Sequence, residues 1–284
     1  MKIQLNAWQL KIIAIIGMII QHTALTLDIT TIEIAPAIRT LMIMAGGLTF
    51  PIIAYLLTEG YKHTSNVKKY ILRMLVFACI SQLPYYLWLG QVHNTLYLNV
   101  MFTLALGLTL IVLYNKMARP LVSLGEEFKA SGKTWKGNTN EVKENRRTFI
   151  KQTIQQKALI NNFLYWLMFA VILVFSVFLE WGIVGLPVIL MYHMIKTEKL
   201  RRTIPAVSII SIIAVLQITD LVLGYADTIN TDIIIALAGV CIAARLLTRF
   251  NGERGKHSKV SKWLFYAMYP AHLIVLAGAI ALIG

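Results

Sequence analysis

Two histidines, His22 and His272, lie inside long apolar runs near opposite ends of this 284-residue chain. Imidazole titrates near neutral pH, so a histidine can take up and return a proton under physiological conditions. Polar side chains at membrane depth are costly in hydrocarbon and usually face a polar cavity or a partner. The two histidines are therefore candidates for proton transfer, and the alternative is that each only hydrogen-bonds between helices. Two histidines without a third ligand make a poor metal site, so no metal is expected.

Other polar groups lie at a similar depth. Counting about 1.5 Å per helical residue, His22 lies roughly 18 Å along its run, past the midplane. Arg39 begins the next run close to the outer surface, Asn99 lies in the outer part of the fourth run, and Tyr269 lies beside His272. No carboxylate is expected near the midplane, where a proton- or sodium-coupled transporter would normally need one. This counts against that class without excluding a simple permease.

The apolar runs that carry these residues are long enough to cross a membrane. The chain is 57% hydrophobic and only 14% charged, which is typical of a polytopic membrane protein. We predict an all-α transmembrane bundle in the cell (plasma) membrane with about nine spans: 10–27, 38–58, 70–89, 97–115, 162–180, 182–196, 204–224, 231–249 and 262–283. Only Glu180-Trp181-Gly182 separates the spans 162–180 and 182–196, so one re-entrant unit is the alternative there. No cleavage pattern follows the first run, which we interpret as a retained span.

Positive charge alternates along the chain. All but one of the 27 Lys and Arg residues lie in or beside alternate gaps between the spans, and the exception is Arg39. Because cations accumulate on the cytoplasmic side, the N-terminus is predicted inside and the C-terminus outside. A cytoplasmic rim against anionic lipid accounts for the net charge of +14, so no nucleic acid is expected as a partner. Arg39 should face protein, and its expected partners are Asp28, Glu33, Asp220 or the cavity that holds His22.

One polar segment divides the predicted spans into two groups. Residues 1–115 carry four spans, residues 116–160 form a cytoplasmic loop, and residues 161–284 carry about five spans. The loop mixes basic and acidic residues, and its latter half, Glu141 to Lys157, is predicted to be helical. It is either a solvated connector or a docking surface. Cys79 and Cys241 both lie in spans and make no disulfide framework.

Several motifs, taken in order, resemble the TraX family. The stretch Leu10–His22 contains a leucine and lysine, an apolar run with methionine, and then a histidine. The other similar stretches cover most spans and the far end of the chain: Phe50–Tyr61, His63-Thr64, Tyr70–Arg73, Ser81–Tyr85, Leu98-Asn99, Asn251–Gly255 and Phe265–His272. Each piece alone is a weak match, but the ordered set is specific.

The resemblance implies an integral-membrane acetyltransferase that moves an acetyl group from cytoplasmic acetyl-CoA to an acceptor amine or hydroxyl. TraX acetylates the amino terminus of conjugative pilin, so the expected partners are a pilin-like peptide or another cell-surface acceptor, with membrane lipid around the bundle. Acyl transfer needs a base near neutrality, which makes His22 the candidate base. His272 is a second candidate on the opposite wall of one cavity. The candidate donors to the oxyanion are Arg39, Asn99 and Tyr269.

Coenzyme A carries phosphates that cannot enter hydrocarbon, so its binding residues are expected at the inner ends of the spans. The candidates are Arg73, Arg245, Arg249, Asn251, Gly252 and Arg254. The alternative for these arginines is the ordinary positive-inside rim. Two other classes of protein stay open: a permease-like or flippase protein, and a noncatalytic assembly protein of a conjugation or surface-appendage system.

Overall fold

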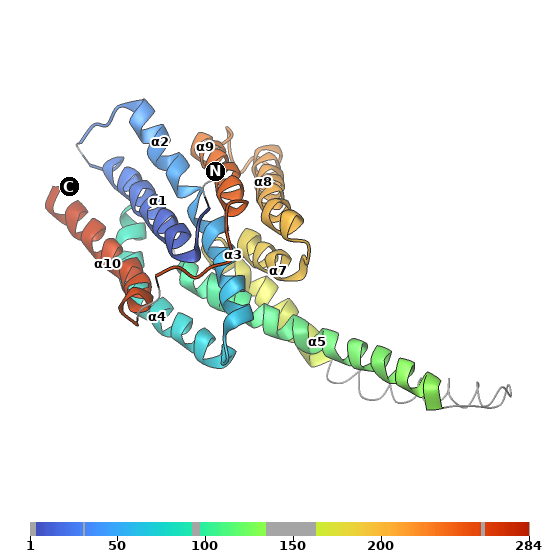
Figure 1. The fold of residues 1–284 in the computed structure, drawn as a ribbon. Helices are drawn as coiled ribbons and strands as arrows, with labels where there is room; N and C mark the ends of the chain where they lie inside the picture. The colour runs from blue at the N-terminus through green and yellow to red at the C-terminus, as the bar shows by residue number, and fades with distance from the viewer. Residues whose placement is uncertain (1–3, 31, 93–96, 135–162, 257–258, 284) are drawn as a thin grey trace. The chain divides into compact units, whose positions relative to one another are not determined.

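A computed structural model describes residues 4–30, 32–92, 97–134, 163–256 and 259–283, and within these ranges the chain is all-α and forms no sheet. The helices labelled in Figure 1 are α1 (Ala7–Leu27), α2 (Pro36–Gly46), α3 (Thr49–His63), α4 (Val67–Val92), α5 (Val100–Thr134), α7 (Gly182–Met194), α8 (Glu198–Val222), α9 (Thr231–Leu247) and α10 (Lys259–Ile283). A further helix covers 163–175, and a 3-10 turn follows at Ser176–Phe178. The predicted all-α fold is confirmed.

Six stretches of the described residues are long and apolar enough to cross a membrane: Ala7–Leu27, Pro36–His63, Val67–Val92, Val100–Met117, Glu198–Val222 and Trp263–Ile283. The chain is therefore a multi-pass membrane protein. The predicted spans 162–180 and 182–196 correspond to the shorter apolar helices Phe163–Phe178 and Gly182–Met194. The predicted span 231–249 corresponds to α9, which has 17 residues. By length, then, the structure supports six of the nine predicted spans.

The chain divides into two compact units, Met1–Leu108 with Ser176–Gly284, and Thr109–Phe175. In the second unit the later part of α5 lies beside the helix 163–175, and the Lys116 ammonium stands 5.4 Å from the centre of the Tyr165 ring. Residues 116–134 of the predicted loop continue α5, whereas its predicted helix, Glu141 to Lys157, lies outside the described residues. All of the predicted site residues belong to the first unit.

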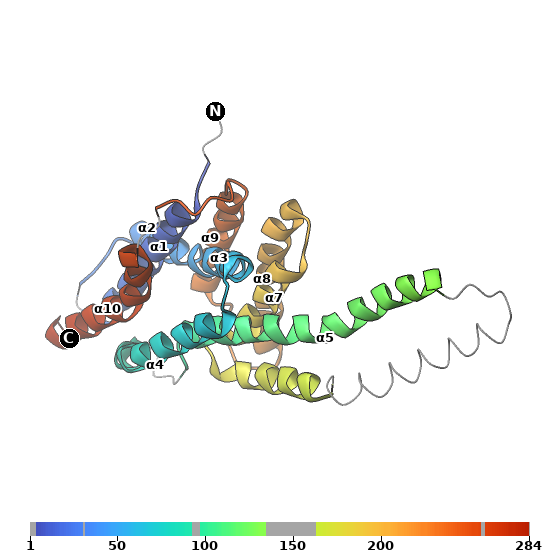
Figure 2. The ribbon, with the colours of Figure 1, turned by 60° about the horizontal axis from the view of Figure 1, so that its bottom comes forward.

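Within the first unit, α1 packs against α2, α3 and α10, while α10 packs along α4, as Figures 1 and 2 show. A capping box begins α1: the Asn6 side chain accepts from the Gln9 backbone, and the Gln9 side chain accepts from the Asn6 backbone, so two otherwise unpaired donors are satisfied. A Cβ at Gly17 would collide with the carbonyl oxygen of Ala45. Glycine at this position is therefore what lets α1 and α2 approach so closely.

The predicted span 38–58 is divided into two helices, α2 and α3, by a short break at Gly47-Leu48. At the start of α3, Oγ1 of Thr49 donates a hydrogen bond to the Ala14 carbonyl oxygen at 2.9 Å. This bond ties α3 to the middle of α1. It also places Thr49 and Phe50 on the wall of the cavity described below.

Two backbone bridges bring distant segments of the first unit together. The Leu5 amide donates to the Arg249 carbonyl oxygen and the Asn251 amide donates to the Leu5 carbonyl oxygen, both at 2.9 Å. The loop after α9 therefore lies beside the start of α1. In the second bridge, the Leu98 amide donates to the Phe178 carbonyl oxygen at 2.9 Å, and the Glu180 amide donates to the Leu98 carbonyl oxygen at 2.8 Å. The turn before α7 is thereby fixed against the start of α5.

Candidate active site

His22 on α1 and His272 on α10 meet inside the bundle, although 250 positions separate them in the sequence. Both side chains are buried, and Nδ1 of His22 lies 2.9 Å from Nε2 of His272. Nδ1 of His272 lies 3.0 Å from the carbonyl oxygen of Met268, which can only accept. In the neutral pair, His272 therefore carries its proton on Nδ1, and its Nε2 accepts from the Nδ1–H of His22. The nitrogen of His22 that can take up a further proton is consequently Nε2.

Trp88 on α4 holds the ring of His22 in place. The two rings stack with their centres 4.5 Å apart and their planes 27° apart. The Trp88 Nε1–H donates to Oγ1 of Thr26 at 2.9 Å, and that hydroxyl donates to the His22 carbonyl oxygen at 2.8 Å. The ring stacking and these hydrogen bonds fix both the imidazole plane and the backbone that carries it. His22 is thus positioned before any ligand binds.

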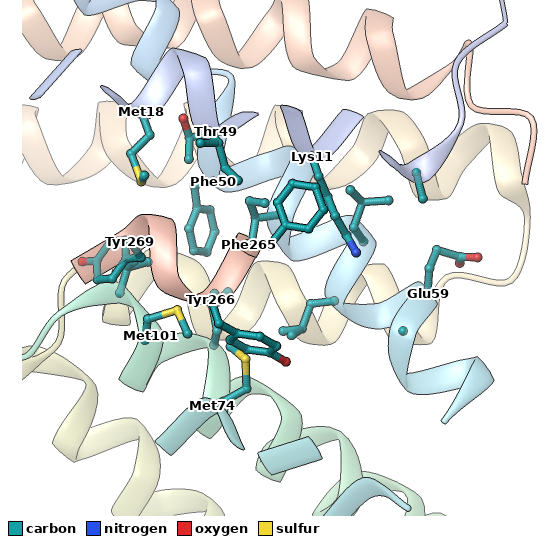
Figure 3. A pocket seen from close by; sticks show the side chains of 18 of the residues that line it. Lys11, Met18, Thr49, Phe50, Glu59, Met74, Met101, Phe265, Tyr266 and Tyr269 are labelled. Carbon is teal, nitrogen blue, oxygen red and sulfur yellow. The ribbon is translucent and has the colours of Figure 1, made fainter. Parts of the chain in front are cut away.

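A cavity of about 560 Å³ runs beside α1 within the first unit. Its lining on α1 extends from Ala7 to His22, which at about 1.5 Å per residue is roughly 22 Å. The other walls come mainly from α3, α4, α5 and α10. In the close view of Figure 3, Met18, Phe50 and Met101 gather toward Tyr269, whereas Lys11 and Glu59 lie toward the other end. The cavity is therefore elongated, with an apolar middle and charged side chains near the start of α1.

Glu180 lines the same cavity as His22. It lies in the turn before α7, outside the six candidate spans. Its Oε2 accepts a hydrogen bond from the Val100 amide at 2.9 Å, and the hydroxyls of Tyr85 and Tyr269 interact with the carboxyl group. Burial raises the pKa of the Glu180 carboxyl to about 7, although these three donors act to lower it. The group therefore exchanges its proton near neutral pH.

Glu180 adds to the site a carboxyl group that the sequence analysis did not assign to it. The sequence analysis placed this residue in a gap between two predicted spans and expected no carboxylate near the midplane. The bridge between Leu98 and Leu179 instead turns the carboxyl group into the cavity that His22 lines. Because Glu180 lies outside the six candidate spans, the expectation of no carboxylate near the midplane stays a prediction.

Four cationic side chains line the cavity where α1 begins: Lys11, Arg73, Arg254 and Lys256. Two of them lie over aromatic rings that also line it. The Lys11 ammonium stands 5.2 Å from the centre of the Phe265 ring, and the Lys256 ammonium stands 5.2 Å from the centre of the Trp8 ring. Cation–π contacts of this kind hold a charge in place without neutralising it. Glu59 and Glu253 also line this end, but Glu59 is paired with Lys62 and Arg201. The cations are therefore in excess, and this end of the cavity is suited to an anionic ligand group.

Arg73 has an unsatisfied donor at this end. Its Nε is buried and has no hydrogen-bond partner among the described residues. The same guanidinium lies 5.7 Å from the centre of the Tyr70 ring and interacts with the Tyr266 hydroxyl. A buried donor without a partner is costly, and arginine donors match phosphate oxygens well. A phosphate-bearing ligand would supply the acceptor that this nitrogen lacks.

Arg39 has protein partners, as expected from the sequence. Its guanidinium binds both oxygens of Asp28, at 2.8 and 2.9 Å, and both oxygens of Asp232, at 2.7 and 2.6 Å. Asp28 was an expected partner, whereas Asp232 on α9 was not. Arg39 does not line the cavity, so its location gives no support to a role as an oxyanion donor. It instead ties the end of α1 to α2 and α9.

The other predicted site residues also differ in whether they line the cavity. His22 and Tyr269 line the cavity, as do Arg73, Gly252 and Arg254, whereas His272, Arg245, Arg249 and Asn251 do not. The Asn99 side chain is fully buried away from the cavity lining, donates to the Ala78 carbonyl oxygen and to Oε1 of Gln82, each at 2.8 Å, and accepts from the Met101 amide at 3.0 Å. Its hydrogen-bonding groups thus join α4 to the start of α5.

Sequence reasoning gave no site role to five residues: Lys11, Tyr85, Trp88, Glu180 and Lys256. Glu180 is the only acidic residue in the range 163–197, and an isolated acid beside two apolar runs was a usable signal. Lys11 and Tyr85 lie in the TraX-like stretches Leu10–His22 and Ser81–Tyr85, but neither was given a role in the site. Trp88 gave no signal, because aromatic side chains are common in any transmembrane helix.

Part of the chain is similar to known proteins. Residues 6–123 match the family model for TraX, described as TraX protein. A stretch of 129 residues is 36% identical to "Probable fimbrial assembly protein FimC, serogroup H1" of Dichelobacter nodosus, over 42% of this chain and 51% of that protein. The chain thus spans about half the length of this curated relative. No solved structure gives a significant match. His22 and Arg73 lie inside residues 6–123, the region that matches the TraX model, whereas Glu180 and His272 lie outside it.

Proposed function

We propose that this multi-pass membrane protein, which matches the TraX family over residues 6–123, is an acetyltransferase that uses acetyl-CoA. The observation that carries the proposal is the His22–His272 hydrogen bond beside a cavity whose other end gathers four cations. Acyl transfer from coenzyme A needs a base at the reacting carbonyl and cations at the phosphates. The proposed acceptor is the amine or hydroxyl of a pilin-like peptide or another surface group, and the relative's name as a fimbrial assembly protein agrees with this.

The cations near the start of α1 would hold the phosphates of the donor. Arg73 and Arg254 were expected in this role, and Lys11 and Lys256 join them on the cavity wall. From there the apolar middle of the cavity leads along α1 toward His22, about 17 Å from Lys11 at 1.5 Å per residue. An extended arm that carries a thioester fits such a passage, because its chain is largely apolar and its charges stay at one end. The inner ends of the spans are cytoplasmic in the predicted topology, where acetyl-CoA is found.

His22 would act as the general base. The acceptor nitrogen or oxygen attacks the thioester carbonyl carbon, and Nε2 of His22 takes the proton that this atom loses. As the C–S bond breaks, the sulfur leaves with the electron pair and receives that proton, so the products are the acetylated acceptor and free thiol. Nε2 of His272 accepts a hydrogen bond from Nδ1–H of His22 and stabilises the imidazolium between the two transfers. Tyr269, which lines the cavity, would donate to the developing oxyanion.

The test is acetyl transfer by purified protein in lipid nanodiscs, with acetyl-labelled acetyl-CoA and a synthetic pilin-like peptide, followed by mass spectrometry. His22→Ala and His22→Gln should insert normally and lose at least about a hundred-fold in turnover, the lower end for removal of a positioned general base. His272→Ala should lose activity in part. His193→Gln is the matched control, because this histidine lies on α7 away from the cavity lining.

Two outcomes separate the possibilities. Retained transfer in both His22 variants would end the claim for His22, and an active His22→Gln alone would reduce this residue to a positioning role. If the wild-type protein acetylates neither amine nor hydroxyl acceptors, the acetyltransferase proposal itself is wrong. The permease-like and noncatalytic assembly classes would then take its place.

A further inference from the structure

The Glu180 carboxyl group has no cationic partner among the described residues. Its neighbours are the Val100 amide and the hydroxyls of Tyr85 and Tyr269, all of which are neutral donors. A charged carboxylate away from bulk water is costly unless donors and a counter-charge surround it. The donors are in place, and the counter-charge is missing. Because Glu180 also lines the cavity, a ligand can supply that charge.

Aromatic side chains line the same cavity as this carboxyl group. The rings of Phe50 and Trp181, which both line the cavity, stack with their centres 4.8 Å apart and their planes 1° apart. Aromatic faces attract ammonium groups, and the attraction is stronger where water is scarce. A cavity that offers both a carboxylate and aromatic side chains is therefore matched to an organic ammonium ion. This surrounding differs from the other end of the cavity, where the cations suit an anion.

The geometry points to Glu180 as a second catalytic residue of the proposed acetyl transfer: it binds the ammonium group of an amine acceptor and takes one proton from it. This inference rests on the proposed function. An amino terminus is mostly protonated at pH 7, since its pKa is about 7.7–8.0, and an ammonium nitrogen has no lone pair with which to attack. The acceptor must therefore lose one proton before the reaction and a second one during it. His22 can take only one of them.

The proton count balances when each of two bases takes one proton from the acceptor. Glu180 accepts a proton from the ammonium group and becomes a neutral carboxylic acid, and the acceptor becomes a neutral amine. The amine nitrogen bonds to the thioester carbon, its extra proton passes to His22, and His22 passes that proton to the departing sulfur. The amide and free thiol are released, and Glu180 returns its proton to water. The Tyr269 hydroxyl is buried and has no hydrogen-bond partner among the described residues, so it is available to the oxyanion.

Two aromatic contacts connect the carboxyl group with the histidine pair. The Tyr269 ring lies 5.6 Å from the His272 ring, and the Tyr85 ring lies 6.4 Å from Trp88, which stacks on His22. Glu180 and His22, the two proton acceptors, are thus connected through packed aromatic rings. The titratable groups that face Glu180 or its direct neighbours are His22 on α1, Tyr85 on α4, Tyr97 before α5, and Tyr269 and His272 on α10.

The test is the pH dependence of acetyl transfer to a peptide amino terminus by the Glu180→Gln variant in nanodiscs. The amide can still accept the hydrogen bond from Val100, but it takes up no proton. We expect a loss of about ten-fold near pH 7, because only about a tenth of the amino terminus is a neutral amine at that pH. The loss should nearly disappear above about pH 9, where the acceptor is already a neutral amine in solution. Glu33→Gln, at an exposed position before α2, is the matched control and should keep the wild-type profile.

A structural role would give a different result, because it would lower the rate equally at every pH. Such a uniform loss, or an unchanged profile, overturns the inference while wild-type transfer upholds the proposed function. If Glu180→Gln does not fold, Tyr85→Phe decides. That variant removes a donor that lowers the pKa of Glu180, so the acid limb of the rate profile should move to higher pH, and an unmoved limb overturns the inference. Absence of wild-type transfer would count against the proposed function instead.

Discussion

Arg73→Ala tests whether the cations near the start of α1 bind the donor. Arg73 lines the cavity, and its Nε is buried without a partner among the described residues. A hydrogen bond to a charged group contributes about 1.5–3 kcal/mol, and about 1.4 kcal/mol is a factor of ten in Kd. Loss of one phosphate contact should therefore weaken apparent affinity for acetyl-CoA by about ten- to a hundred-fold. Affinity for the acceptor should change little, because the acceptor reacts at the other end of the cavity.

The assay measures KM for acetyl-CoA and for the acceptor separately, with titration of free coenzyme A as an independent measure of binding. Arg245→Ala is the matched control, because it removes the same charge from an exposed position at the end of α9, outside the cavity lining. Arg73→Lys keeps the charge but loses the planar fork, so an intermediate loss is expected. Equal losses for both substrates, or equal effects of Arg73→Ala and Arg245→Ala, would return Arg73 to the ordinary positive-inside rim.

Two further predictions concern the framework. Arg39→Ala breaks the pairs with Asp28 and Asp232, whose side chains are about a third exposed. Because exposed pairs contribute about 0.2–1 kcal/mol each, the free energy of unfolding should fall by about 1 kcal/mol in a thermal or denaturant melt. A ten-fold loss of acetyl transfer would contradict this structural role. A reporter fused after Gly284 should be extracytoplasmic and one inserted near Asn138 should be cytoplasmic; if both report the same side, the predicted span count is wrong by one.

The sequence predicted the helical fold well because a lipid bilayer leaves the backbone few choices. Each polar backbone group in hydrocarbon must be paired within the chain, so long apolar runs become helices. The same reasoning identified His22 and His272, since polar side chains at membrane depth need a reason to be there. The structure then showed these two in direct contact. The pattern of apolar residues did not predict the length of the helices within 162–196, where two short helices meet in a turn.

The contacts that the sequence did not reveal are made between segments far apart in the chain. Glu180 faces the cavity because Leu98, 81 positions before Leu179, pairs with that residue through the backbone. Arg39 reaches Asp232 across 193 positions. Neither pairing leaves a local pattern of residue types, because backbone bridges accept almost any side chain and ion pairs need only one residue on each side. Such contacts appear only when the helices have been assembled.

Glu180 also bears on the choice between an enzyme and a coupled transporter. A buried acid that titrates near pH 7 serves either class, so the acid alone does not decide between them. The opposite end of the cavity is more informative. Lys11, Arg73, Arg254 and Lys256 outnumber the acids Glu59 and Glu253 in the lining at that end, while the carboxyl group of Glu180 is suited to an ammonium ion. A single transported substrate would have to pass both ends and would be held back at one of them. Two substrates of opposite charge, entering from opposite ends and exchanging a neutral acetyl group between them, would meet no such barrier, and this favours group transfer over transport.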